Sequence, residues 1–151
     1  MSVSLTEENI RAFAAAWYYA LDIHAPVEDC LKLLADENLE MIFPEKTMRS
    51  EAEFREWYHN VTNFFFDENH YVQSVQIEMS GEEAHLDISV GWQASWWIPP
   101  TAKSKRTSMN ATQKWTVRPA KQNGKNTFGL EIVFYNATAK PFEYAPGFAQ
   151  L

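Results

Sequence analysis

Four side chains in this sequence are suited to proton transfer near neutral pH, the histidines His24, His59, His70 and His85. An imidazole gains or loses its proton close to the pH at which proteins work, so it can act as a general acid or base. His70 opens a segment whose alternation places its ring on the inward face of a predicted strand. We therefore expect His70 to be the catalytic residue if the protein is an enzyme. The alternative is a structural histidine at the mouth of a pocket.

The other chemistry-bearing residues are expected to lie outside any active site. His24 falls in a connector, and His59 is expected to lean outward from its helix. His85 and Asp87 share the outer face of a strand, and one such pair is too little for a metal site. Cys30 has apolar neighbours and is interpreted as a core residue. The sequence has neither a glycine-rich phosphate loop nor a nucleophile elbow, and we expect no metal and no cofactor.

Aromatic and amide side chains are the candidates for binding a small molecule. A ligand pocket needs an apolar wall and a few polar groups that orient the ligand. Gln113 interrupts an apolar strand face, and a buried amide without a partner would cost about 1–3 kcal/mol. The alternative is that the aromatic side chains only fill the core. The predicted substrate-binding residues are Trp17, Tyr18, Phe43, Tyr58, Trp92, Gln113 and Asn136.

A long strand is predicted to position these side chains. Residues 84–97 alternate apolar and polar for longer than an average strand, which indicates an antiparallel sheet with one buried and one solvated face. Gly91 lies in its middle, where the strand can bend. In the preceding strand, residues 70–79, the inward parity changes near Ser74, which predicts a β-bulge. A long bent strand of this kind can wrap a sheet around helices and leave a hollow.

Helices are predicted before the strands, which is the order of an α+β fold. A capping box at Ser4-x-x-Glu7, with Thr6 as a rival cap, precedes the first helix. Pro26 suits the start of a second helix, and Ser50-x-x-Glu53 caps a third. Asp67-Glu68-Asn69 is expected to end the helical unit. The predicted strands are residues 39–43, 70–79, 84–97, 107–117 and 127–138, and Asn123-Gly124 is predicted to form a hairpin turn. The aromatic tail, residues 140–151, is expected to lie either on its own sheet or on a partner chain.

Composition limits the classes of function. The 151 residues predict a single domain, residues 1–151, and 46% apolar residues argue against disorder. The formal net charge of −7 argues against nucleic-acid and anionic membrane partners. The single cysteine cannot form an internal disulfide, and the N-terminus shows no apolar signal segment, so we expect a cytoplasmic protein.

The element order, together with a strand that opens Asn-His-Tyr-Val at Asn69, resembles the nuclear transport factor 2-like superfamily. Its SnoaL-like group of polyketide cyclases, ketosteroid isomerases and scytalone dehydratases is the most similar part. The resemblance implies a cystatin-like cone, in which three N-terminal helices pack in a strongly curved antiparallel sheet around a pocket. It also implies a homodimer formed through the outer sheet face.

Residue by residue the resemblance is mixed. His70 matches a pocket histidine of dehydratase-like members, and Tyr18 lies close to a pocket tyrosine of the isomerases. The carboxylate base of the isomerases would stand at Phe43, before Pro44, and the second histidine of the dehydratases would stand near Trp92. Neither group is present, so ketosteroid-type isomerisation and a two-histidine dehydratase site are not supported.

Two functions are compatible with these observations. The first is a domain that binds an apolar or aromatic small molecule and uses His70, without a cofactor, for a dehydration, isomerisation or cyclisation. The alternative is a non-catalytic binding or assembly subunit, similar to the small subunits of ring-hydroxylating dioxygenases. The missing carboxylate base and the aromatic tail favour this alternative.

Overall fold

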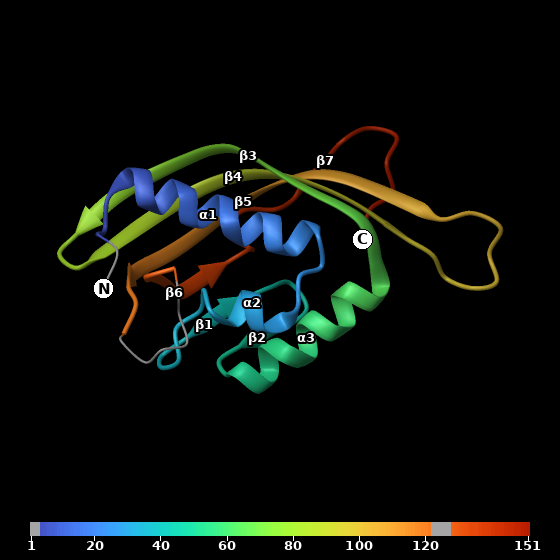
Figure 1. Cartoon of the computed structure of the whole chain (residues 1–151). Helices are drawn as coiled ribbons and strands as arrows, with labels where there is room; N and C mark the ends of the chain where they lie inside the picture. The colour runs from blue at the N-terminus through green and yellow to red at the C-terminus, as the bar shows by residue number, and fades with distance from the viewer. Residues whose placement is uncertain (1–3, 122–127) are drawn as a thin grey trace.

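The computed structural model describes residues 4–121 and 128–151 as helices on the concave side of one curved sheet (Figure 1). The strand order in the sheet is β2-β1-β6-β5-β4-β3, and β7 pairs with β5. The α+β cone of cystatin-like type is therefore confirmed. The elements in chain order are α1 (Glu7–Asp22), α2 (Val27–Leu31), β1 (Glu40–Ile42), β2 (Thr47–Met48), α3 (Glu51–Phe64), β3 (Phe65–Ser80), β4 (Glu83–Trp96), β5 (Lys105–Pro119), β6 (Leu130–Asn136) and β7 (Glu143–Tyr144).

The long strands β3, β4 and β5 form an arch, and α1 lies beneath it (Figure 1). One face of α1 is buried against this arch, including Phe13 and Trp17. The sheet is antiparallel except where β1 runs parallel to β6. This parallel pair, and the short strand β2, were not expected from the sequence. The direction of β6 is set by its antiparallel pairing with β5, whereas β1 precedes that meander in the chain.

Side-chain caps begin the two long helices. Ser50 Oγ accepts a hydrogen bond from the backbone N–H of Glu53 at 3.2 Å, as the capping-box pattern predicts. At α1 the rival cap is used, because Thr6 Oγ1 accepts from Asn9 N at 3.2 Å. Pro26 precedes α2, a single short turn of helix. Cys30 is a fully buried core residue, and burial raises the pKa of its thiol to about 11.

β3 begins directly where α3 ends, so Asp67-Glu68-Asn69 lies inside a strand and the predicted boundary is wrong. The register with β4 shifts twice, between Phe66 and Asn69 and between Val72 and Ser74. The second shift confirms the predicted bulge. The first was not predicted; it contains Asp67 at a φ of +55°, a conformation that aspartate tolerates better than most residues.

Gly91 leaves room for an aromatic ring from the neighbouring strand. It pairs with Tyr71 across β3 and β4, and a Cβ atom at Gly91 would lie 2.2 Å from Tyr71 Cε2. We predict that Gly91→Ala displaces this ring and lowers the free energy of unfolding by about 0.5–1 kcal/mol, the size of a cross-strand pair. Urea denaturation measures the change. The same substitution in a Tyr71→Ala background is expected to be neutral, and an equal loss in both backgrounds would contradict this explanation.

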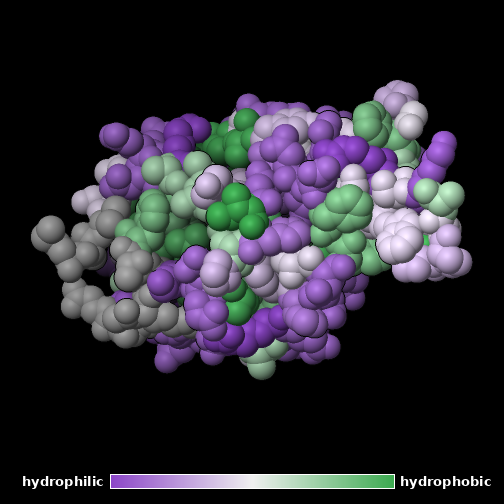
Figure 2. Space-filling view, turned by 45° about the vertical axis from the view of Figure 1, so that its right-hand side comes forward, coloured by the Kyte–Doolittle hydropathy of each residue, from purple (hydrophilic) through white to green (hydrophobic). Residues whose placement is uncertain are grey.

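The outer face of the sheet is mostly polar. Gln73 links strands there, since its Nε2 donates to Asn110 Oδ1 at 2.9 Å and its Oε1 accepts from Ser89 Oγ at 2.8 Å. His85 and Asp87 are exposed on this face. Figure 2 shows one side of the surface, where apolar groups stand apart from one another among hydrophilic ones. In the described residues, no helix has the length and apolar character needed to cross a bilayer.

The aromatic tail packs on its own chain. β7 pairs with β5, Met109 opposite Tyr144, and Ala145 N donates to Ser108 O at 2.8 Å. The side chains of Phe142 and Leu151 lie in the wall of the cavity described below. The predicted turn at Asn123-Gly124 lies outside the described residues.

Candidate active site

A cavity of about 520 Å³ lies between α3, the arch of the sheet and the tail. Its volume falls in the range typical of small-molecule sites. The wall is mainly apolar and aromatic, with Trp57 and Phe64 from α3, and Val90 and Ala111 from the sheet. Polar side chains are the minority of the wall, and those of Glu68, His70 and Gln113 carry hydrogen bonds to other parts of the chain.

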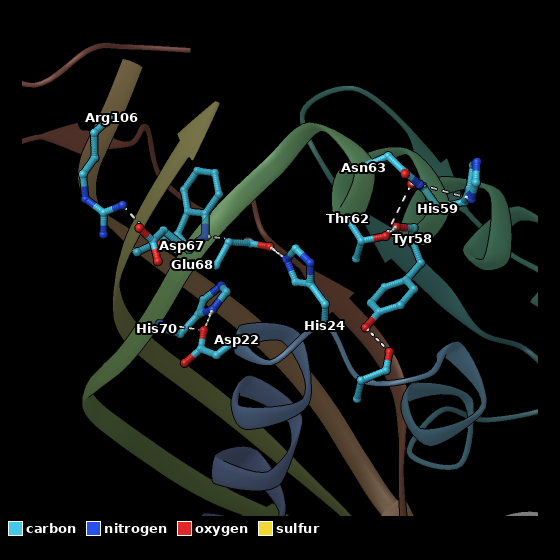
Figure 3. Close-up of polar contacts among 12 residues, drawn as sticks. Asp22, His24, Tyr58, His59, Thr62, Asn63, Asp67, Glu68, His70 and Arg106 are labelled. Atoms are coloured by element: carbon cyan, nitrogen blue, oxygen red, sulfur yellow. Dashed lines mark hydrogen bonds and ion pairs between the residues drawn. The ribbon is translucent and has the colours of Figure 1, made fainter. Parts of the chain in front are cut away.

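His70 lies in this wall and is held by Asp22 at the end of α1 (Figure 3). Asp22 Oδ1 contacts His70 Nδ1 at 2.6 Å and also accepts the backbone N–H of His70 at 2.8 Å. The second contact fixes the carboxylate oxygen in place. A carboxylate accepts only, so Nδ1 is the protonated ring nitrogen when the imidazole is neutral. Among the described residues Nε2 has no hydrogen-bond partner, so it is available to accept a proton.

A second histidine–carboxylate pair stands next to the first (Figure 3). Glu68 Oε2 contacts His24 Nε2, and Glu68 Oε1 accepts the indole N–H of Trp92 at 3.0 Å. The Glu68 side chain is only 9% exposed and lies in the cavity wall. The His24 side chain is 27% exposed, so it lies partly at the surface, as expected for a connector, while its ring contacts Glu68. Arg106 supports the bulge that carries Glu68, because its Nη1 donates to Asp67 O at 3.1 Å.

Five of the predicted site residues line the cavity: Phe43, Tyr58, His70, Trp92 and Gln113. The other three do not. Trp17 is fully buried behind the wall, where its Nε1 donates to Tyr135 Oη at 3.4 Å. Asn136 closes a turn at the end of β6, because its Oδ1 accepts from the backbone and the hydroxyl of Thr138, both at 2.8 Å.

Tyr18 lies behind the wall as well, but it contacts two of the lining residues. Its ring stacks on His70 with the centroids 5.3 Å apart, and its hydroxyl donates to Gln113 Oε1 at 2.5 Å. The indole N–H of Trp115 reaches the same oxygen at 3.2 Å. Burial raises the pKa of Tyr18 well above its ordinary value and that of Tyr135 to about 12, so both hydroxyls stay protonated at any working pH.

Tyr58 contributes its ring to the wall, but its hydroxyl is engaged elsewhere. It donates to the carbonyl oxygen of Ala25 at 2.5 Å, which ties α3 to the connector after α1. Burial raises the pKa of Tyr58. Of this predicted substrate-binding residue, the ring faces the cavity, while the hydroxyl holds α3 against the connector.

The cavity carries negative but no positive formal charge. None of its lining residues, within the described part of the chain, is lysine or arginine. Glu45 lies at its border and accepts the indole N–H of Trp57 at 2.7 Å. Among the described residues, no group of three or more His, Cys, Asp or Glu side chains could hold a metal ion. The wall therefore favours an uncharged, apolar guest.

No family model and no curated protein sequence matches the chain. Solved structures do match it. A cystatin-like protein of unknown function from Nostoc punctiforme has a TM-score of 0.67 at 16% identity over 100% of both chains. A nuclear transport factor 2-like superfamily protein from Salmonella enterica has a TM-score of 0.64 at 17% identity, over 95% of this chain and 96% of the other. The chain has the nuclear transport factor 2-like fold.

Enzymes also share this nuclear transport factor 2-like fold. The hexachlorocyclohexane dehydrochlorinase LinA-type3 from Novosphingobium barchaimii is similar to this chain, with a TM-score of 0.69 at 12% identity over 95% of this chain and 92% of the other. At these identities the likeness concerns the fold, and the chemistry has to be argued from the cavity itself.

Proposed function

We propose that this protein is a cofactor-independent lyase of the SnoaL-like type, which eliminates a leaving group from an apolar, ring-sized substrate. The observation that carries the proposal is the pair formed by His70 and Asp22 in the wall of an otherwise apolar cavity. His70 Nε2 removes a proton from a carbon next to an electron-withdrawing group. Electrons of that C–H bond form the new double bond as the leaving group departs.

Asp22 has two effects in this proposal. Its Oδ1 holds the proton on Nδ1, which leaves the Nε2 lone pair directed away from the carboxylate. Its negative charge stabilises the imidazolium that forms when Nε2 takes the substrate proton. Because the same oxygen also accepts the backbone N–H of His70, the pair is positioned before the substrate binds.

The wall supports an uncharged aromatic or alicyclic substrate. Phe43, Trp92 and Trp57 supply flat apolar surfaces. Gln113 supplies the amide that faces them, and its carbonyl oxygen is already engaged by Tyr18 and Trp115. Its NH₂ group also hydrogen-bonds to the Tyr135 hydroxyl, which leaves one N–H of this side chain to donate to a substrate carbonyl. The dehydrochlorinase with this fold is an elimination enzyme by its name, which agrees with the proposal.

The test uses a bicyclic β-hydroxy ketone, 3-hydroxy-1-tetralone, whose dehydration gives the fluorescent product 1-naphthol. We expect the protein to accelerate this reaction over buffer, with a primary isotope effect when the carbon between the ketone and the carbinol carries deuterium. Serum albumin at equal concentration is the control for unspecific catalysis in an apolar site. Acceleration no greater than that of albumin, both for this compound and for its 3-acetoxy analogue, would overturn the proposal.

The alternative of a non-catalytic assembly subunit has less support, because the aromatic tail packs on its own sheet and is not left for a partner chain.

A homodimer formed through the outer sheet face remains part of the proposal. Its support is the uncovered outer side of β3, β4 and β5, where Tyr71 is exposed among polar residues (Figure 1).

A further inference from the structure

We propose that Glu68 and His24 together supply the proton that the leaving group needs. The substrate is then an uncharged compound with a hydroxyl group on the carbon next to the one that loses its proton. This inference rests on the elimination proposed above. It assigns a role to a pair that the reaction at His70 leaves unused.

The two pairs are formed by the same two segments, each of which supplies the carboxylate of one pair and the histidine of the other (Figure 3). Asp22 and His24 are two residues apart at the end of α1, and Glu68 and His70 are two residues apart at the start of β3. Asp22 faces His70, whereas His24 faces Glu68. The cavity therefore has two acid–base groups close together on one side, each with a partner of opposite type.

The bulge between Phe66 and Asn69 gives Glu68 its place. In a regular strand, successive side chains point to opposite faces of the sheet. The register shift and the positive φ of Asp67 interrupt this alternation, so Asp67 and Glu68 are not paired with residues of β4. The Glu68 carboxylate, which lies in the cavity wall, then reaches Trp92 in the same wall and His24 in the connector after α1. A carboxylate that is only 9% exposed in an apolar wall indicates a use for it, because burying such a group is unfavourable.

The chemistry of the leaving group decides what this pair can do. Hydroxide is a strong base and departs readily only when it takes up a proton as the C–O bond breaks. A halide departs without a proton but needs positive charge or several donors around it, and the described lining contains no lysine or arginine. A wall with an acid–base pair and without cations thus fits dehydration better than dehydrohalogenation.

The proton balance is complete with these groups. His70 Nε2 takes the proton from the carbon, and the C–H electrons form the double bond. The C–O bond breaks, and the oxygen keeps the bonding electrons and takes the proton shared by Glu68 and His24, so that water leaves. His70 then carries one extra proton and the Glu68–His24 pair lacks one, and exchange with water restores both.

The experiment compares two probes with one carbon skeleton, 3-hydroxy-1-tetralone and 3-acetoxy-1-tetralone. Acetate leaves without a proton, so only the hydroxy compound needs a general acid. Glu68→Gln keeps an acceptor for the Trp92 indole but cannot supply the proton. We expect it to lower kcat for the hydroxy probe by about 10²-fold or more and to change kcat for the acetoxy probe less than about threefold.

His24→Gln is the second variant, which keeps the test decisive if Glu68→Gln folds poorly by circular dichroism. Glu83→Gln is the matched control, because Glu83 contacts His85 at 3.5 Å on the exposed side of the sheet. Equal losses on both probes, or no loss on either, in Glu68→Gln and His24→Gln would overturn this inference and leave the elimination standing. If wild-type protein turns over neither probe faster than albumin does, the proposed function itself fails.

Discussion

Replacing His70 by glutamine is expected to lower kcat for 3-hydroxy-1-tetralone by about 10³-fold, with a much smaller change in KM. Glutamine has nearly the length of histidine and preserves polarity, but it cannot accept a proton from carbon at neutral pH. Both probes should lose turnover, because each needs a base. Stopped-flow fluorescence of the naphthol product measures the rate.

A second histidine variant, outside the cavity, is the control that shows whether the loss depends on the position of His70. His85→Gln changes an imidazole that also contacts a carboxylate, Glu83, but on the outer face of the sheet. Its kcat should stay within a factor of two of wild type. A His70→Gln variant that retains the wild-type rate and fold would remove His70 from the mechanism.

Asp22 provides a graded version of the same experiment. In Asp22→Asn the amide oxygen can still accept both the backbone N–H and the Nδ1–H of His70, because one atom makes both contacts. The orientation and the tautomer of the ring are kept and only the charge is lost, so kcat should fall by about 10²-fold, less than the roughly 10⁴-fold that the wrong tautomer costs in a serine protease triad. Asp22→Ala removes the orientation too and should approach the His70→Gln rate.

Much of the fold follows from periodicity and capping, which act locally. The bulge near Ser74 was predictable because two runs of inward residues have opposite parity, and a single extra residue reconciles them. The third helix was predictable from the Ser50 capping box. The parallel contact of β1 with β6 was not, because it depends on the path of the whole chain between residues that are about 90 positions apart.

The candidate site likewise contains residues that a local sequence pattern predicts and residues whose roles depend on the tertiary structure. His70 was identified because its own strand pattern points it inward. Asp22 and His24 were missed as partners, because their roles depend on where the end of α1 meets β3 and on a bulge at Asp67 that hydrophobic alternation does not reveal. The sequence does place a carboxylate two residues before a histidine in both segments, at Asp22–His24 and at Glu68–His70, but the same spacing also occurs at Glu83–His85 on the outer face of the sheet. Trp17 and Asn136 were assigned to the pocket from their strand or helix face alone, which cannot distinguish the wall from the layer behind it.

Gln113→Leu is expected to lower the free energy of unfolding by about 2–4 kcal/mol. Gln113 Oε1 is the acceptor for the Tyr18 hydroxyl at 2.5 Å and for the Trp115 indole at 3.2 Å, and all three side chains are buried. Leucine has a similar volume, so packing is largely kept and the loss comes from donors left without an acceptor. Each such buried group costs about 1–3 kcal/mol.

Urea denaturation followed by far-UV circular dichroism measures this loss. The control is Gln76→Leu, at an exposed strand position, which should change the free energy of unfolding by no more than about 0.5 kcal/mol. The cause is separated by a double-mutant cycle. Tyr18→Phe removes one of the donors, so the Gln113→Leu substitution should be less destabilising in that background than in wild type. Additive losses would show that the two side chains are not coupled. In that case the position of His70, which stacks on Tyr18, would have to be maintained by Asp22 without the support of the hydrogen-bonded network behind it.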